Sequence, residues 1–273
     1  MRVGIHLPQY GKLAGPAAIV EAARLAESLG FADVWVSDHT VHPAAQDYPS
    51  PRLFDPLLTL ATAAAVTERV GLGTSVMVVP THNPLGLANA LASLDALSEG
   101  RLILGAGAGW SEAEYAALGY DFASRGRRLD EALDLFRVVW RDDPATFHGT
   151  YSDFEDVRVL PRPVGPVPIW IGGVSDTAIR RAAERGDGYQ AIGLTPEQAV
   201  PLVAKVRAAR PETSFTISLR TGWDPQGMEP SRIVDERAAF EEAGIQHVVA
   251  APWQRDLPSW LTSMSTLAEL LSF

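Results

Sequence analysis

Short apolar runs alternate with longer amphipathic runs along the whole chain. The short runs have the length and composition of buried strands, which we expect at Val3–Leu7, Asp33–Ser37, Val70–Val76, Leu102–Ala106, Pro168–Ile171, Gly188–Ile192, Phe215–Leu219 and His247–Ala250. The longer runs predict helices at Ala17–Leu29, Pro56–Thr67, Pro84–Ser98, Gly126–Arg141, Thr177–Arg185, Pro196–Ala209, Arg232–Ala243 and Leu257–Leu271. This alternation is typical of a parallel sheet covered by helices.

Glycine and proline mark several of the predicted helix boundaries. Gly30 and Gly244 follow helices that they can end in the left-handed conformation, and Pro56 and Pro84 stand where a first helical turn tolerates a missing amide. Strand–helix units of this number and length predict a (β/α)8 TIM barrel in the α/β class. A doubly wound open sheet is the alternative, but it calls for a glycine fingerprint where this chain has Pro8-Gln9-Tyr10-Gly11.

The 273 residues show no linker and no second domain, so we expect one domain over residues 1–273. The longest departure from the strand–helix pattern is the segment 142–167, where Phe147-His148-Gly149-Thr150-Tyr151 indicates a small hairpin. An insertion after a helix belongs at the face opposite the site unless it folds over the rim. We therefore expect this insertion to have a structural role.

Composition excludes several classes of partner. A net charge of -10 argues against nucleic acid or an anionic membrane as the main partner. No apolar run approaches a membrane span and no signal peptide is evident, so we expect a cytoplasmic protein. The chain has no cysteine, and the positions of Lys12 and Lys205 do not suit a Schiff-base aldolase. Arginine or backbone amides are therefore expected to bind any anionic ligand.

Polar residues follow the predicted strands at the end where a barrel has its mouth. The sharpest pair is Asp38-His39, because a carboxylate beside an imidazole can fix its tautomer while the imidazole exchanges a proton. We predict His39 as the proton-transfer group and Asp38 as its orienter, although Asp38 as a simple loop cap is the alternative. His42 follows closely, but the spacing is not that of a metal site, and we expect no metal.

Two glycine-rich segments also end predicted strands. Gly172-Gly173 precedes Ser175 and a helix, an arrangement that favours phosphate, with an ordinary strand–helix turn as the alternative. The run Gly105 to Gly109 presents almost no side chain, so that a flat ligand can lie on the backbone. Tight packing of the strand against its helix explains the same run. Trp110 stands where a dinucleotide fingerprint needs its third glycine.

Several segments, taken together, resemble the bacterial luciferase-like superfamily, most closely its branch dependent on the deazaflavin coenzyme F420. They are Val34–His39, Leu94–Arg101 running into the glycine run, Arg125–Glu131, and Pro168–Gly173 with Gly186–Gly188. The resemblance covers positions 3 to about 190. Beyond these positions only the strand–helix rhythm continues.

This resemblance implies a TIM barrel that holds the cofactor ring in its mouth and the cofactor phosphate on the Gly172-Gly173 loop. It implies that Asp38 and His39 lie beside the ring and that Ser75-Val76 forms a bulge with a cis peptide that supports the ring face. The implied cofactor-binding residues are Asp38, His39, Ser75, Val76, Gly105, Gly107, Ala108, Gly172, Gly173 and Val174. It also implies a homodimer.

The resulting hypothesis is an oxidoreductase that transfers a hydride between coenzyme F420 and a small organic substrate. The predicted substrate-pocket residues are His6, His42, His82 and Trp110. The alternatives are an FMN-dependent monooxygenase, a catalytically silent cofactor-binding protein, and an isomerase or lyase acting on a phosphate ester. Sugar-phosphate dehydrogenases of the family place a carboxylate and a tryptophan where this chain has Trp110 and Pro43, which argues against glucose 6-phosphate. We assign no role to Glu112 or Glu114, one turn further.

Overall fold

Eight parallel strands close into a barrel in the computed structural model, which describes residues 1–44, 50 and 52–272. The strands are β1 (Arg2–His6), β2 (Asp33–Val36), β3 (Gly71–Thr74), β5 (Leu102–Gly107), β8 (Ile169–Gly172), β9 (Gly188–Ile192), β10 (Thr216–Thr221) and β11 (His247–Ala250). The pairings β1 with β11 and β3 with β5 complete the ring. The predicted TIM-barrel fold is confirmed, and an open sheet is excluded because it would leave edge strands unpaired.

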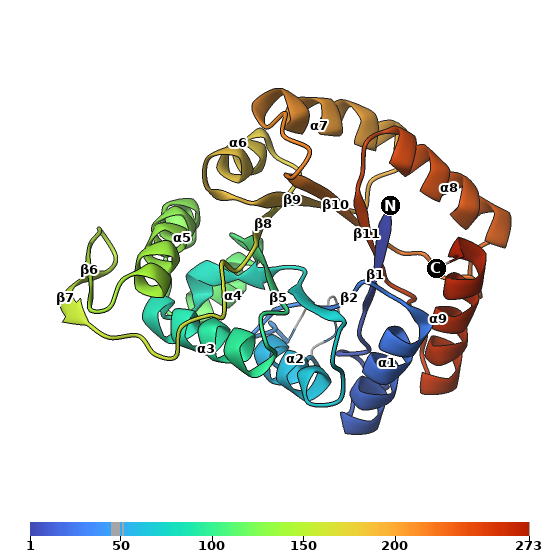
Figure 1. Ribbon diagram of the computed structural model, residues 1–273, viewed down its shortest axis with the longest axis horizontal. Helices are drawn as coiled ribbons and strands as arrows, with labels where there is room; N and C mark the ends of the chain where they lie inside the picture. Colours follow the sequence, from blue (N-terminus) through green and yellow to red (C-terminus); the bar gives the residue numbers. More distant parts are fainter. Residues whose placement is uncertain (45–49, 51, 273) are drawn as a thin grey trace.

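Helices follow the strands and form an outer ring around them (Figure 1). They are α1 (Pro16–Leu29), α2 (Pro56–Ala64), α3 (Pro84–Leu97), α5 (Arg125–Arg141), α6 (Asp176–Arg185), α7 (Pro196–Ala209), α8 (Pro230–Glu242) and α9 (Leu257–Leu271). Gly30 ends α1 with a φ of 89°, as predicted, and the Asn83 side chain accepts from the Gly86 amide at the start of α3. Within the described segments, no helix is both long and apolar enough to cross a membrane.

Two short elements near the mouth depart from the predicted pattern. The predicted strand Val70–Val76 ends early, at Thr74, and a separate two-residue strand, β4 (Met77–Val78), pairs with β5 after a break. The helix α4 (Glu112–Ala117) has six residues, too few to show a helical periodicity in the sequence. Both elements contribute to the site described below.

The insertion forms an antiparallel hairpin of β6 (Ala145–His148) and β7 (Asp153–Val157), as the sequence predicts. Glu131 of α5 fixes its turn, because the amides of Thr150, Tyr151 and Ser152 donate to the Glu131 carboxylate at 2.6 to 2.7 Å. The turn reaches the rim of the barrel, where Tyr151 and His82 line the same small cavity. The hairpin therefore folds back toward the mouth along α5.

Buried polar and aromatic side chains fill the end of the barrel opposite the mouth. Asp33, at the start of β2, accepts hydrogen bonds from the Trp35 indole and from Nε2 of His247, the latter at 2.9 Å. Nδ1 of His247 lies 2.8 Å from Ser218 Oγ, and the rings of Trp35 and Trp170 stack at 5.3 Å. This packing fills the lower half of the barrel, so that the site is to be sought at the mouth.

Candidate active site

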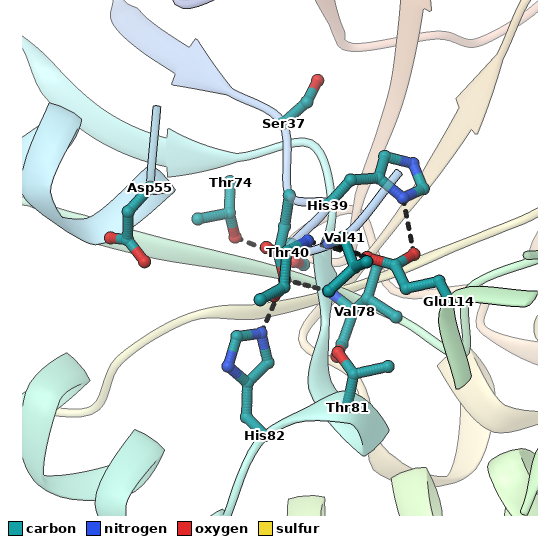
Figure 2. A network of polar contacts seen from close by, with 12 residues as sticks. Ser37, His39, Thr40, Val41, Asp55, Thr74, Val78, Thr81, His82 and Glu114 are labelled. Carbon is teal, nitrogen blue, oxygen red and sulfur yellow. Dashed lines mark hydrogen bonds and ion pairs between the residues drawn. The ribbon is translucent and has the colours of Figure 1, made fainter. Parts of the chain in front are cut away.

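A buried carboxylate holds His39 at the mouth of the barrel (Figure 2). Oε2 of Glu114, on α4, lies 2.8 Å from Nδ1 of His39, and its other oxygen accepts from the amides of Thr40 at 2.7 Å and Val41 at 3.2 Å. Burial opposes ionisation of Glu114, but the hydrogen bonds from His39 and the two amides outweigh it and lower its pKa. Glu114 is therefore an ionised acceptor in the neutral pH range.

Asp38 does not contact His39 as the sequence predicts. Its Oδ2 accepts from the Val78 amide at 2.9 Å and from Nε2 of His82 at 2.8 Å. The reason is geometric, because successive side chains of an extended segment point to opposite sides. Burial lowers the pKa of His82, but the hydrogen bond to Asp38 and the Asp38 charge outweigh this effect and raise it. The predicted orienter of His39 is thus wrong, and Asp38 forms a second carboxylate–imidazole pair.

Aromatic rings surround His39. The ring centroids of His42 and of Trp110 each lie 5.5 Å from that of His39, and Trp110 meets it edge-on at 71°. Trp110 is 53% exposed, so that part of the residue is accessible to a ligand. Nε2 of His42 is buried and has no hydrogen-bond partner among the described residues. The fold therefore brings two of the four predicted substrate-pocket residues to His39.

His6 belongs to a different part of the mouth. Its Nδ1 lies 2.8 Å from the Leu7 carbonyl and its Nε2 lies 2.9 Å from Ser37 Oγ, which also accepts from Arg220 at 2.8 Å. Complete burial and the charge of Arg220 hold the pKa of His6 well below its usual value. His6 is therefore neutral, and its ring packs 5.5 Å from that of Tyr10 rather than against His39.

Arg220 is a site residue that the sequence analysis missed. It is 7% exposed and donates from β10 to the Ser75 carbonyl at 2.8 Å. It also lies over the Trp253 ring, with 5.5 Å between the guanidinium carbon and the ring centroid. The available signal was an arginine directly after the predicted strand Phe215–Leu219, at the end where side chains face the barrel mouth. Arg220 ties β10 to the bulge after β3.

In the bulge after β3, the Val76 side chain packs against Gly107 and Gly172. The Ser75–Val76 peptide is cis, as the resemblance implies. A Cβ added at Gly107 or at Gly172 would lie 2.6 Å from a methyl group of Val76, and one at Gly105 would lie 1.9 Å from the Thr74 carbonyl oxygen. These glycines therefore make room for the bulge itself. Contact of Gly105, Gly107 and Gly172 with a ligand stays a prediction.

The remaining residues of the glycine run also have protein partners. The Ala108 carbonyl accepts from the Tyr115 hydroxyl at 2.6 Å, and the Ala108 side chain packs against the core. Any contact of Ala108 with a ligand stays a prediction.

The loop after β8 leaves backbone amides available. Gly173 has a φ of 133°, and its carbonyl accepts from the Tyr189 hydroxyl. Ser175 Oγ accepts from the Ala178 amide at 3.2 Å and so begins α6. None of the hydrogen bonds within residues 1–44, 50 and 52–272 uses the amides of Val174 or Ser175. These two amides are therefore available as donors to an anion, and anion binding at this loop stays a prediction.

Lys205 lies at the same helix start. Its Nζ, on α7, is 2.8 Å from Asp176 in the first turn of α6. Lysine was not expected at an anion site, because nothing in the sequence indicates that α7 packs beside this turn. The lysine compensates an acidic residue that would otherwise repel an anion here.

A closed parallel barrel with two carboxylate–imidazole pairs at its mouth belongs to the broad class of α/β barrels. The comparison with family models is more specific: the chain belongs to the luciferase-like monooxygenase family, whose model matches residues 1–222. Within the described part of the chain, no three His, Asp or Glu side chains converge as metal ligands.

The chain is also similar to individual proteins. An uncharacterized protein of Mycobacterium tuberculosis is 31% identical over 211 residues, which cover 72% of this chain and 73% of the relative. An F420-dependent glucose-6-phosphate dehydrogenase of Amycolatopsis mediterranei is 33% identical over 224 residues, covering 77% and 66%. The solved structure of an F420-dependent secondary alcohol dehydrogenase has a TM-score of 0.84 at 19% identity, covering 98% and 97%, which supports the fold.

Proposed function

We propose that this luciferase-like oxidoreductase uses coenzyme F420 and exchanges a hydride between it and a small organic substrate. The observation that carries the proposal is His39, held at the barrel mouth by the carboxylate of Glu114 at 2.8 Å. In the part of the chain that the structure describes, no hydrogen bond uses Nε2 of His39. A fixed imidazole with one unused nitrogen is suited to proton transfer.

The residues at the mouth fit a flat, phosphate-bearing cofactor. Val76 is partly exposed on its bulge and supplies an apolar support for a ring. The amides of Val174 and Ser175 and the start of α6 supply donors for a phosphate. The buried Nε2 of His42, without a partner among the described residues, supplies a polar contact. We assign the cofactor contacts of the resemblance, Asp38 and His39 included, to this site.

Deazaflavin, when bound, supplies the hydride chemistry, and the protein supplies positioning and proton transfer. His39 accepts a proton at Nε2 when the substrate is oxidised and returns it when the substrate is reduced. Glu114 stays ionised and holds the ring in place. Trp110 and His42 restrict the space around the His39 ring, which helps to exclude water from the proton-transfer path.

The substrate that we propose is not a sugar phosphate. Trp110 is half exposed at the mouth, beside His39, in the place where the sugar-phosphate dehydrogenases of the family have a carboxylate. The rings of Trp110 and His42 suit a small molecule that has an apolar surface and one group that hydride transfer can change, a hydroxyl to be oxidised or a carbonyl to be reduced. His6 and His82 stay predicted pocket residues, and neither contacts His39.

Titration with F420 and with FMN, followed by cofactor fluorescence, tests the cofactor. We expect binding of F420, followed by reduction or oxidation of F420 with members of a panel of alcohols and carbonyl compounds. His39→Ala should then lower turnover by about 100-fold or more while F420 still binds. Turnover that is unchanged in His39→Ala would overturn the assignment of the proton-transfer group.

An FMN-dependent monooxygenase is the second candidate, because the family is described as luciferase-like monooxygenases. Binding of FMN without binding of F420 would favour it. A catalytically silent binding protein would bind F420 and turn over nothing in the panel. An isomerase or lyase would require phosphate esters to compete with the cofactor.

The homodimer, the cytoplasmic location and the extent of the domain over residues 1–273 stay predictions. Light scattering on the purified protein measures the oligomeric state directly.

A further inference from the structure

We propose that Glu114 is the positioning residue of the site: its carboxylate fixes His39 as the Nδ1–H tautomer and leaves Nε2 as the nitrogen that exchanges the substrate proton. The proposal rests on the proposed function for the identity of the proton-transfer group. The tautomer itself depends only on contacts within this chain, so that it can be measured without cofactor or substrate.

The contacts leave Glu114 little freedom. The residue is 1% exposed, and its two oxygens face three donors, Nδ1 of His39 and the amides of Thr40 and Val41. These donors lie in the loop after β2, whereas Glu114 lies on α4, which follows β5. One carboxylate therefore fixes the backbone of the catalytic loop and the ring that the loop carries.

The ionisation state of Glu114 decides which ring nitrogen carries the hydrogen. An ionised carboxylate accepts hydrogen bonds and donates none, so that Nδ1 of His39 must be the donor. The pKa of Glu114 is lowered, because the hydrogen bonds that it accepts outweigh the effect of its burial. A neutral His39 consequently has its lone pair on Nε2, for which the described residues provide no partner.

The other groups around His39 do not compete for this role. Asp38, the adjacent carboxylate, is bound to Val78 and His82. Trp110 contacts His39 through its aromatic ring, which carries no charge. The pKa of His42 is lowered by burial and by the nearby charge of His39, so that His42 is a neutral neighbour at neutral pH. Glu114 is thus the group that sets the orientation and the tautomer.

Glu114→Gln separates positioning from packing. The amide oxygen of glutamine can still accept from Thr40 and Val41, but its NH2 group faces Nδ1 of His39 and must donate to it. The hydrogen of the neutral ring then moves to Nε2, which can no longer accept the substrate proton. Glu112→Gln, an exposed glutamate of the same helix, is the matched control.

Imidazole ¹⁵N–¹H correlation spectra of the protein without cofactor measure the tautomer, with His39 assigned by the loss of its signals in His39→Gln. We expect the Nδ1–H form in the wild type and in Glu112→Gln, and the Nε2–H form in Glu114→Gln. The Nε2–H form in the wild type, or the same tautomer in the wild type and Glu114→Gln, would overturn the proposal. The wild-type spectrum decides even where the variant does not fold.

Kinetics with F420 provide a second readout. Glu114→Gln should lower kcat by about 100-fold or more, with KM and the Kd for F420 changed by less than about threefold, because the lost group acts through His39. Glu114→Asp should recover part of the loss, since a carboxylate returns. An unchanged kcat in Glu114→Gln with an inverted tautomer would overturn the catalytic role of this positioning. Failure of the wild type to use F420 would instead overturn the proposed function and leave the tautomer assignment standing.

Discussion

Asp38 lies 2.8 Å from Nε2 of His82, and this contact turns its carboxylate away from the adjacent His39. The mouth therefore contains two separate carboxylate–imidazole pairs, one of Glu114 with His39 and one of Asp38 with His82. The second pair also fixes the backbone after the bulge, because Asp38 accepts from the Val78 amide. It is therefore expected to contribute to stability in a pH-dependent way.

The stability contribution of His82 should decrease as the pH rises. The folded state raises the pKa of His82 above 6.5, so that the contribution of the charged pair is complete below that pH and is lost as the pH rises through the folded-state pKa. Urea denaturation at about pH 6 and about pH 9 measures the difference, with His82→Gln as the reference. We expect the wild type to lose more stability than His82→Gln over this interval. An equal loss in both proteins would contradict the prediction.

Gly107→Ala should destabilise the protein through Val76. The added Cβ would lie 2.6 Å from a Val76 methyl group, a degree of overpacking that costs about 1–3 kcal/mol. The double variant with Val76→Ala should recover most of this loss, because the methyl group is gone. Gly165→Ala is the control, since nothing lies within 4 Å of its added Cβ. Denaturant midpoints of the wild type, Gly107→Ala, Val76→Ala and the double variant test the coupling, and strictly additive effects would contradict it.

The alternation of strands and helices predicted the fold, because most elements are long enough for the spacing of their apolar residues to show whether they are strands or helices. Strands β9 and β11 occupy the predicted ranges, and the hairpin of the insertion follows its turn residues. The predicted strand Val70–Val76 failed locally, because hydrophobicity cannot indicate a break at Ser75 inside an apolar run. One feature of the sequence indicates helix α4: Ser111 is followed three residues later by Glu114, which is the spacing between an N-cap serine and the glutamate of a capping box.

The site was less predictable, because its contacts join segments far apart in the sequence. His39 was identified from its place after a strand, but its partner Glu114 is 75 residues away, and the neighbour Asp38 was the wrong choice. Arg220 contacts the Ser75 carbonyl across 145 positions. Adjacency in the sequence indicates candidates for a site, whereas the direction of each side chain depends on the tertiary fold.

The buried contact between Asp33 and His247 should be among the largest polar contributions to stability. Asp33→Ala would leave the Trp35 indole and the His247 ring without their acceptor in a fully buried site, at a cost of about 3 kcal/mol or more. Asp153→Ala is the control, because Asp153 pairs with His148 on the exposed hairpin. Its denaturant midpoint should match that of the wild type. A similar midpoint for Asp33→Ala and Asp153→Ala would contradict the assignment.

Tyr189 should control binding at the proposed phosphate loop. Its hydroxyl donates to the Gly173 carbonyl, and burial raises the pKa of Tyr189, which keeps the hydroxyl protonated as a donor. In a planar trans peptide the carbonyl and the next amide point in opposite directions, so that this bond turns the Val174 amide away from Tyr189. Tyr189→Phe should weaken F420 binding roughly 5- to 10-fold, because the loop loses the bond that fixes this orientation.

The comparison that isolates the phosphate uses the deazaflavin chromophore without its phosphate-bearing tail. Fluorescence titration should give nearly the same Kd for this chromophore with the wild type and with Tyr189→Phe, because in the proposed arrangement the loop contacts the phosphate and not the ring. Tyr151→Phe is the control, since the Tyr151 hydroxyl accepts from Arg127 on an exposed surface. Equal weakening of both ligands in Tyr189→Phe would mean that Tyr189 supports the barrel as a whole, and the specific link between this hydroxyl and the phosphate loop would be lost.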